Sequence, residues 1–342
     1  MKVSVIIKAL NEEDNIALCI ESAMRNVADI EGEILLIDSF STDRTLQIAA
    51  KYPVRIIQFK DSLDPSCGAA PELGYQQSSG EFIYFLDGDM VLADGFIKRA
   101  MAYLEDHPEV GGVGGRILDT SILTDADLQR HQRYSRLVTI KEVMCLDGGG
   151  LYRRNAIKEV GYFSHQGLAA CEETELGVRL MCKGWHLIRL PFSGVYHTGH
   201  QETSTQAMFR LWKNGRYAAH TFFLRSAIGK PWFKLALKTQ WFVFAPLLLH
   251  ILAFVSFYVV STVFIGLSIW VWIPMFWLVI MGYLAVKKRS IHTALRSLLS
   301  WHLYMSAGLL SIGQPLRSPY RTISYTDKES LKNLKHTRCR KI

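Results

Sequence analysis

The chain has 342 residues and a formal net charge of +8, enough for one large domain or two small ones. The charge is uneven, because no Asp or Glu occurs between Glu202 and Asp327, whereas Lys and Arg recur throughout that span. A basic block beside long apolar runs favours an anionic membrane surface over nucleic acid as the partner.

The six cysteines form no C-x-x-C pair and show no metal-type spacing, which indicates reduced thiols in a cytosolic protein. Met1-Lys2 leads directly into a short strand pattern. We therefore expect no signal peptide, with the polar half of the chain on the cytoplasmic side.

The first 92 residues alternate apolar strand patterns with helical ones. Apolar runs at 3–7, 34–37, 54–59 and 82–86 predict strands, and the spacing in 15–24 and 44–51 predicts helices. Such alternation predicts an α/β fold with a mostly parallel sheet covered by helices on both faces. Asp38 and Asp87 each follow a strand, at the sheet edge where ligands bind in folds of this kind.

The fourth strand run ends abruptly in Asp87-Gly88-Asp89. A hard cation such as Mg²⁺ or Mn²⁺ takes oxygen ligands and often bridges carboxylates to substrate phosphates. The glycine lets the backbone approach a ligand closely. The alternative is a solvated turn after the strand, since Asp and Gly are common turn residues.

Several motifs, in order, resemble those of the family 2 glycosyltransferases, which have the GT-A nucleotide-sugar fold. They are Ser4-Val-Ile-Ile7 with Asn11-Glu-Glu13, Ile37-Asp-Ser-Phe-Ser-Thr-Asp-Arg-Thr45, Phe85-Leu-Asp-Gly-Asp89, Gly148-Gly-Gly-Leu-Tyr-Arg-Arg154, Glu172-Glu-Thr-Glu-Leu176, Arg179-Leu180, Gly184 and Val195-Tyr-His197. The resemblance implies a GT-A domain over residues 1–205, with a Rossmann-like nucleotide-binding half at 1–92 and an acceptor and catalytic half at 93–205.

The resemblance implies that Asp38 binds the nucleotide, with Ala9, Asn11 and Glu12 lining the same pocket. A carboxylate can accept hydrogen bonds from ring N–H groups or ribose hydroxyls. The alternative role of Asp38 is to cap the turn that follows its strand.

The same resemblance makes Asp89 the direct ligand of Mn²⁺ or Mg²⁺, with Asp87 contacting ribose or metal-bound water. His197 is the expected third ligand, because imidazole is acceptable to Mn²⁺. His200 is the nearby alternative, and a structural hydrogen bond is the other use of a lone histidine.

Glu172 and Glu173 begin a predicted helix, where acidic side chains also suit the helix dipole. The resemblance implies that Glu173, with Glu172 as the alternative, is a general base that takes the proton of the acceptor hydroxyl. In-line displacement by one acceptor inverts the anomeric centre. The loop Asp147-Gly148-Gly149 is expected to line the acceptor side, or else to be a simple turn.

The chain departs from the family pattern at two places. Families of this type carry Ala-Arg-Asn-x-Gly before the D-x-D strand, where Arg and Asn hold the diphosphate, and here the stretch reads Ala70-Pro-Glu-Leu-Gly74. The second acidic motif reads Glu172-Glu173 where Glu-Asp is usual. The first departure questions the usual diphosphate contact, and the second changes the reach of the base by one methylene.

Residues 206–240 interleave cations with aromatic side chains and predict amphipathic helices at the membrane interface, broken at Pro231. Arg210 and Arg216 are expected to hold the acceptor's diphosphate, or else only to attach the segment to an anionic lipid surface. Residues 241–286 carry no charge and predict two transmembrane helices near 241–260 and 264–286. Residues 287–342 predict an interfacial or re-entrant helix at 294–312 and a basic cytoplasmic tail.

The sequence therefore predicts a membrane-anchored, inverting, metal-dependent glycosyltransferase of the bacterial inner membrane. It would take a UDP- or GDP-sugar and glycosylate a polyprenyl diphosphate-linked glycan during surface polysaccharide assembly. The alternatives are a polyprenyl-phosphate sugar synthase, a processive synthase, which Gln206 to Trp212 only partly resembles, and a non-enzymatic sugar-nucleotide-binding module. Nucleic acid is not expected as a partner, and the oligomeric state stays open.

Overall fold

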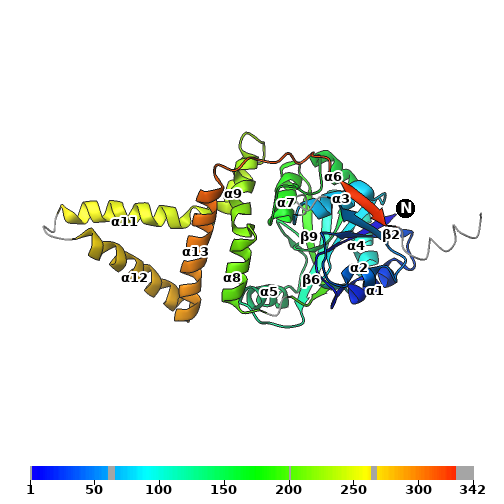
Figure 1. Cartoon of the computed structure of the whole chain (residues 1–342), viewed down its shortest axis with the longest axis horizontal. Helices are drawn as coiled ribbons and strands as arrows, with labels where there is room; N and C mark the ends of the chain where they lie inside the picture. Colours follow the sequence, from blue (N-terminus) through cyan, green and yellow to red (C-terminus); the bar gives the residue numbers. More distant parts are fainter. Residues whose placement is uncertain (1, 61–65, 200–201, 263–267, 329–342) are drawn as a thin grey trace, which may run out of the picture. The chain divides into compact units, whose positions relative to one another are not determined.

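The computed structural model describes residues 2–60, 66–199, 202–262 and 268–328, which belong to two compact units (Figure 1). The first unit runs to Ser204 and resumes at Leu316, and the second spans Thr205–Pro315. The chain thus leaves the first unit once and returns to it near its end.

Within the described residues, one ten-stranded sheet has the order β10-β3-β2-β1-β4-β8-β6-β9-β5, with β7 beside β9. The strands are β1 (Val3–Ala9), β2 (Gly32–Asp38), β3 (Arg55–Phe59), β4 (Phe82–Asp87), β5 (Met90–Leu92), β6 (Val110–Asp119), β7 (Lys141–Glu142), β8 (Gly149–Arg153), β9 (His186–His197) and β10 (Tyr325–Lys328). The predicted strands at 3–7, 34–37, 54–59 and 82–86 are therefore confirmed.

The sheet is mixed, so the expectation of a mostly parallel sheet is correct only for its first half. β3, β2, β1 and β4 pair in parallel, whereas β8 is antiparallel to both β4 and β6. β9 is parallel to β6 but antiparallel to β5 and β7. Hydrophobic runs predict strands, but they do not reveal the direction in which distant strands pair.

Helices of the first unit cover both faces of this sheet (Figure 1). They are α1 (Ile16–Val27), α2 (Thr45–Ala49), α3 (Ala69–Gln77), α4 (Phe96–Asp106), α5 (Asp125–Ser135), α6 (Arg154–Val160) and α7 (Glu172–Cys182). One apolar core contains side chains of α1 and α4, and the other contains those of α3, α6 and α7. In α1 the buried residues Ile16, Cys19, Ile20 and Ala23 share one helical face, as their spacing predicts.

The sequence grouped residues 287–342 into one helix and tail, and this is wrong for the part from Leu316 to Lys328. Strand β10 adds to the sheet edge antiparallel to β3, and Asp327 Oδ2 accepts a hydrogen bond from Arg55 over 2.7 Å. Ile323 is buried in the apolar core under α3. None of the side chains of this short edge strand is buried, so the strand has no clear hydrophobic pattern.

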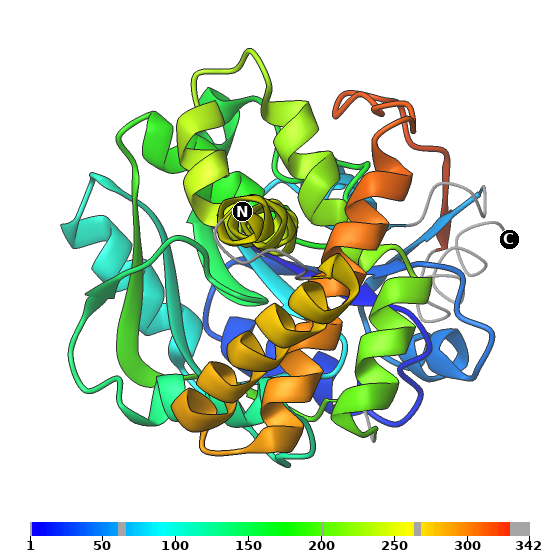
Figure 2. The same cartoon turned by 90° about the vertical axis from the view of Figure 1, so that its left-hand side faces the viewer.

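The second unit is helical in the described residues. It contains α8 (Ser204–Lys213), α9 (Arg216–Ala227), α10 (Phe233–Gln240), the 3₁₀ turn η1 (Trp241–Val243), α11 (Ala245–Ser261), α12 (Ile269–Lys288) and α13 (Ile291–Ser311), with Ser204 itself assigned to the first unit. The break between α9 and α10 contains Pro231, so the predicted interruption there is confirmed. In Figure 2 the gold ribbon of α12 lies beside the orange ribbon of α13, with which it is in contact.

Helix α9 does not present its aromatic and cationic side chains as the sequence predicted. Tyr217 and Phe223 are buried, and the Tyr217 ring meets that of Tyr304 on α13 edge-on. The Arg225 guanidinium donates to the carbonyl oxygen of Ser311, the last residue of α13, over 2.7 Å and to that of Gln314, just beyond the helix, over 2.8 Å. These side chains hold α9 on α13, because unpaired carbonyls at a helix end need donors.

One helix of the described residues, α12, is long and apolar enough to cross a membrane, with a mean hydropathy of 2.0. A second span results only if Phe233–Val243 and Ala245–Ser261, which bend by 64° at their junction, act together. The first residues of the predicted span at 264–286, up to 267, lie outside the described residues. The transmembrane hairpin stays a prediction.

Candidate active site

The predicted donor-side residues lie where β1 and β4 end next to each other. Lys8 is opposite Asp87 in this parallel pairing, and the Gly88 N–H donates to the Lys8 carbonyl oxygen over 2.8 Å. A Cβ at position 88 would lie 2.9 Å from Cγ of Glu12. The D-x-D turn therefore touches the loop after β1, which requires a residue without a side chain at this point.

Asp87 faces a lysine that the sequence reading did not single out. Nζ of Lys8 lies 2.9 Å from Oδ1 of Asp87 and 3.6 Å from Oε1 of the buried Glu172. Burial raises the pKa of the Asp87 carboxyl, Lys8 lowers it and Asp89 raises it further, so that the pKa lies above its ordinary value. Glu172 thus lies beside a cation.

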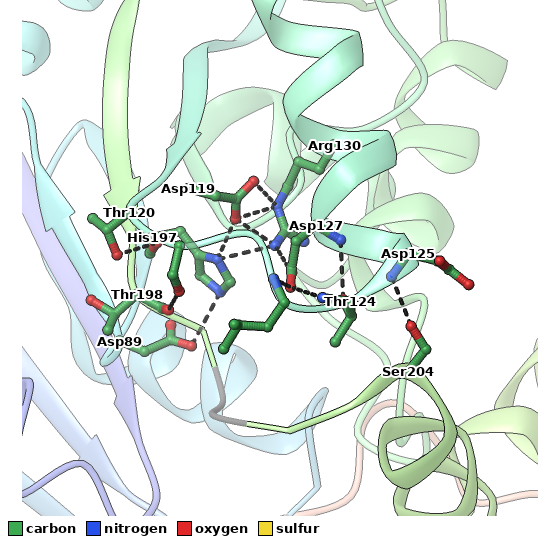
Figure 3. A network of polar contacts seen from close by, with 12 residues as sticks. Asp89, Asp119, Thr120, Thr124, Asp125, Asp127, Arg130, His197, Thr198 and Ser204 are labelled. Carbon is green, nitrogen blue, oxygen red and sulfur yellow. Dashed lines mark hydrogen bonds and ion pairs between the residues drawn. The ribbon is translucent and has the colours of Figure 1, made fainter.

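His197 lies between two carboxylates (Figure 3). Its Nε2 is 3.3 Å from Oδ2 of Asp89, and its Nδ1 is 2.8 Å from Oδ1 of Asp119. β9 places His197 between Met90 of β5 and Asp119 of β6. Burial lowers the pKa of the imidazole, but the hydrogen bonds to Asp89 and Asp119 outweigh burial and leave the pKa above its ordinary value.

Asp119 is itself fixed by Arg130, as Figure 3 shows. Nε and one terminal nitrogen of Arg130 donate to Asp119 over 2.9 and 2.5 Å, and the terminal nitrogen also reaches Asp127 over 2.7 Å. Asp127 forms a capping box with Thr124 at the start of α5. A carboxylate on the far nitrogen of a histidine fixes the ring orientation, as in many metal sites.

Asp89 and His197 have donor atoms that suit a divalent cation. Among the residues that the structure describes, no three His, Cys, Asp or Glu side chains are grouped as a complete metal site. Mg²⁺ is commonly bound by one or two carboxylates together with substrate phosphates, and imidazole suits Mn²⁺. The pair Asp89 and His197 fits that mode, whereas Asp87 is engaged with Lys8. His200 lies outside the described residues.

Glu173 is the carboxylate that faces the loop at Gly148. One of its oxygens accepts the Gly148 N–H, and the other accepts the Tyr152 hydroxyl over 3.2 Å. Burial raises the pKa of Glu173 to about 8, and neighbouring carboxylates contribute in the same direction. A group whose pKa lies near the working pH suits proton transfer. Glu172 and Glu173 therefore have different partners, although they are adjacent in sequence.

The Asp147-Gly148 loop connects the two halves of the site. Both residues have positive φ, 47° and 80°, which glycine adopts without strain and Asp tolerates. A Cβ at Gly148 would lie 3.1 Å from Oδ2 of Asp87. Gly149 begins β8, and a Cβ there would lie 3.1 Å from Val195. Gly148, whose N–H contacts the predicted base Glu173, therefore lies against Asp87 at the end of β4.

Asn11 and Glu12 join the loop after β1 to the loop after β2. The Asn11 side-chain oxygen accepts the Thr42 N–H over 2.8 Å, and the Glu12 N–H donates to the Thr45 hydroxyl over 2.7 Å. Burial raises the pKa of Glu12 to about 7. Both residues therefore lie at the predicted nucleotide end, and their contact with a nucleotide stays a prediction.

Asp38 is fully buried opposite Ala9, its neighbour in the β1–β2 pairing. Its carboxylate accepts the N–H groups of Phe40 and Ser41, at 3.1 and 3.2 Å, and the side-chain amide of Gln58 at 2.9 Å. Asp38 thus caps the turn after β2, which is its alternative role. A nucleotide contact by Asp38 and Ala9 stays a prediction.

The departure at Ala70 to Gly74 has a structural reason. Glu72 is buried on α3, and its Oε2 accepts the N–H groups of Phe163 and Ser164 at 2.8 and 3.0 Å. A Cβ at Gly74 would lie 2.3 Å from Cγ2 of Ile6, so α3 packs tightly on β1. Glu72 stands where the family usually has a phosphate-binding residue. Here its carboxylate holds the loop at Phe163 and Ser164 in place.

Arg210 lies on α8 and Arg216 begins α9, both in the second unit. Their acceptor contact stays a prediction. The sequence reading missed Lys8, Asp119, Arg130 and Tyr152. Asp119 is the last residue of its strand, as Asp87 is of β4, and this position could have marked Asp119 as a candidate site residue.

Residues 4–161 match the model of the family described as Glycosyl transferase family 2. A poly(ribitol-phosphate) β-N-acetylglucosaminyltransferase, TarS, of Staphylococcus aureus (strain MW2) is 26% identical over 183 residues, which are 51% of this chain and 31% of the relative. The chain thus spans about a third of the length of this curated relative.

Two solved structures share the fold. S. aureus TarS 1-349 in complex with UDP-GlcNAc is 18% identical with a TM-score of 0.53, and the likeness covers 93% of both chains. Mannosyltransferase PcManGT from Pyrobaculum calidifontis in complex with GDP-Man and Mn²⁺ is 16% identical with a TM-score of 0.56, over 91% of this chain and 86% of that one. At these identities the likeness concerns the fold alone. The match over residues 4–161, together with the mixed sheet and its D-x-D strand end, makes this part of the chain similar to glycosyltransferase family 2.

Proposed function

We propose that the protein is an inverting glycosyltransferase that moves a sugar from a nucleotide diphosphate donor to a hydroxyl of a lipid-linked glycan. The observation that carries the proposal is the position of Gly148, whose amide donates to Glu173 and which lies against Asp87. This places a carboxylate with a raised pKa close to the D-x-D end of the sheet. The proposal includes a UDP- or GDP-sugar donor, because the two structural neighbours hold UDP-GlcNAc and GDP-Man.

On the donor side, Ala9, Asn11, Glu12, Asp38 and Asp87 would surround the nucleotide. Asp89 and His197 would hold Mn²⁺ or Mg²⁺, and Asp119 would keep the imidazole in place. A divalent ion, when bound, neutralises charge on the departing nucleoside diphosphate. PcManGT was solved with Mn²⁺, which supports the choice of ion.

On the acceptor side, deprotonated Glu173 takes the proton of the acceptor hydroxyl. The hydroxyl oxygen then bonds to the anomeric carbon from the face opposite the nucleotide, and the bond from that carbon to the diphosphate oxygen breaks. The Gly148 N–H and the Tyr152 hydroxyl orient the carboxylate throughout. A phosphate acceptor would need no base, so the environment of Glu173 supports a hydroxyl acceptor over a polyprenyl phosphate.

The lipid-linked acceptor and the inner-membrane location rest on the second unit. α12 is apolar up to Val286, and Leu284 is the one buried residue of this helix. Exposed side chains such as Trp270 and Val286, 86% and 80% exposed, favour a lipid environment over water. Lys287 and Lys288 end this helix, which favours a cytoplasmic end by the positive-inside tendency. The proposed pathway is surface polysaccharide assembly on a polyprenyl diphosphate carrier.

The test uses the full chain in membranes and reads release of nucleoside diphosphate across a panel of nucleotide sugars. Glu173→Gln should lower kcat by about 10²–10⁴-fold while donor binding persists. Glu105→Gln changes an exposed carboxylate elsewhere and serves as the control. No release with any donor would refute the enzymatic proposal in favour of a binding module. An inactive Glu172→Gln together with an active Glu173→Gln would show that Glu172 is the base.

A further inference from the structure

The first unit contains a cavity of about 720 Å³ that the donor site does not use. It lies between α5, the segment that follows α5 and the loop at Asp147. Cavities of this volume are typical of small-molecule sites. Four cations line it, namely Arg133, Arg136, Lys141 and Arg189, against two carboxylates, Glu142 and Asp147.

Arg189 supplies a fixed positive charge at the inner end of this cavity. Its side chain is 3% exposed, and one terminal nitrogen donates to the Gly115 carbonyl oxygen over 2.5 Å. The guanidinium lies over the Tyr134 ring, 4.7 Å from the centroid, and 3.5 Å from Oδ2 of Asp147. A buried cation is costly unless charge and hydrogen bonds offset its lost hydration. Asp147 offsets it only in part at that distance.

The two carboxylates of the cavity are already engaged. Oδ2 of Asp147 accepts the Tyr134 hydroxyl over 2.8 Å, and its Oδ1 accepts the Cys145 thiol over 3.0 Å. Oε1 of Glu142 lies 2.8 Å from Nδ1 of His186. Asp147 also forms the ion pairs with Arg133 and Arg189, so neither carboxylate is paired with Arg136 or Lys141.

Arg136 and Lys141 are exposed at the mouth of the cavity. Within the described ranges, neither side chain makes a hydrogen bond or ion pair, although both backbones are hydrogen-bonded. Arg133 is 65% exposed and forms an ion pair with Asp147 at 3.6 Å. Cationic donors that converge without partners suit an anionic ligand.

The cavity adjoins the predicted base. Asp147 lines it, and the next residue, Gly148, donates its N–H to Glu173. A ligand held here would therefore lie beside the carboxylate that accepts the acceptor proton. We propose that the cavity binds an anionic group, a phosphate or a carboxylate, carried by the acceptor glycan, so that the enzyme selects acidic acceptors. This inference rests on the proposed function.

The experiment measures binding and needs no catalysis. The full chain in detergent is titrated with three probes of similar length, a glycerol phosphate oligomer, a glucuronate oligosaccharide and a neutral maltooligosaccharide. Arg136→Gln/Lys141→Gln removes the two mouth cations, and Lys98→Gln/Lys158→Gln removes two exposed cations of the same unit away from the cavity. The two variants carry the same net charge.

The wild-type protein and the Lys98/Lys158 variant should bind an acidic oligomer at least about tenfold more tightly than the neutral one. The Arg136/Lys141 variant should lose most of that preference, and the acidic probe that binds more tightly identifies phosphate or carboxylate. Equal binding of all three probes by the wild type, or an unchanged preference in the Arg136/Lys141 variant, would overturn the inference. Nucleoside diphosphate release, measured in parallel, tests the proposed function independently.

Discussion

The ammonium nitrogen of Lys8 lies 2.9 Å from Oδ1 of Asp87, where β1 and β4 end side by side. Burial lowers the pKa of Lys8, but Asp87 and Glu172 outweigh burial and keep the ammonium charged. The first carboxylate of the D-x-D motif is therefore neutralised within the protein. The second, Asp89, faces His197.

Lys8→Met should destabilise the protein, because it leaves Asp87 and Glu172 without their cation. The Lys8 and Asp87 side chains are 18% and 28% exposed. The loss in the free energy of unfolding should therefore lie between the roughly 1 kcal/mol of surface pairs and the 3–5 kcal/mol of buried ones. Denaturant unfolding of the full chain measures it. Lys2→Met, which breaks an exposed pair with Glu105, should leave stability nearly unchanged. An equally stable Lys8→Met would mean that the pair contributes nothing.

The activity should depend on pH through Glu173. The pKa of this carboxyl is about 8, and the base must be deprotonated, so kcat/KM should fall tenfold per pH unit below that value. The pH profile of kcat/KM at saturating metal measures this. A flat profile from about pH 6 to 9 would contradict the role of Glu173 as the base.

The ionisation of Glu173 should also make the folded protein less stable as the pH rises. The folded-state pKa of Glu173 is raised from 4.5 to about 8, so its contribution is fully present below the lower value and is lost as the pH rises through the upper one. Replacing Glu173 with Gln removes this titration. The Tm of Glu173→Gln relative to wild type should therefore be higher at about pH 9 than at about pH 5. The same Tm difference at both pH values would contradict it.

Metal affinity should depend on Asp119 as well as on Asp89. Asp119→Asn weakens the acceptor that fixes His197 and should lower Mn²⁺ affinity by about 10–100-fold. Direct titration with Mn²⁺ measures the affinity without turnover, and the exposed Asp106→Asn serves as the control. Asp89→Ala should abolish binding, and a chelator should stop transfer. Unchanged affinity in Asp89→Ala would exclude this site.

Glu72 should matter for stability and not for the donor. Glu72→Ala leaves the buried N–H groups of Phe163 and Ser164 without an acceptor, at a cost of about 1–3 kcal/mol for each group. Thermal unfolding measures the loss, and the donor KM should stay unchanged. A stable Glu72→Ala protein with a raised donor KM would instead assign Glu72 to the diphosphate.

Arg210 and Arg216 give a prediction for the second unit. If they contact the acceptor, Arg210→Ala and Arg216→Ala should raise the acceptor KM by about tenfold without changing membrane partitioning. Lys234→Ala and Lys238→Ala are the matched variants on α10. If all four variants lose membrane binding alike and keep the same acceptor KM, the segment is only an anchor.

The sequence alone determined the elements that local pattern controls. The apolar runs before Asp38 and Asp87 predicted β2 and β4, and the acidic start at Glu172 predicted α7. These succeed because strand length, helical spacing and a strand end marked by carboxylates are all local properties. The order of several such motifs also predicted the family, which the match over residues 4–161 bears out.

Only the tertiary structure decided which distant side chains meet. Lys8 reaches Asp87 across neighbouring strands, and Asp119 reaches His197 through the pairing of β6 with β9. β10 returns to β3 from the far end of the chain. Each contact joins residues that are tens to hundreds of positions apart, and it depends on strand order and direction. Hydrophobic periodicity records which face of a strand is buried but not which strand lies beside it.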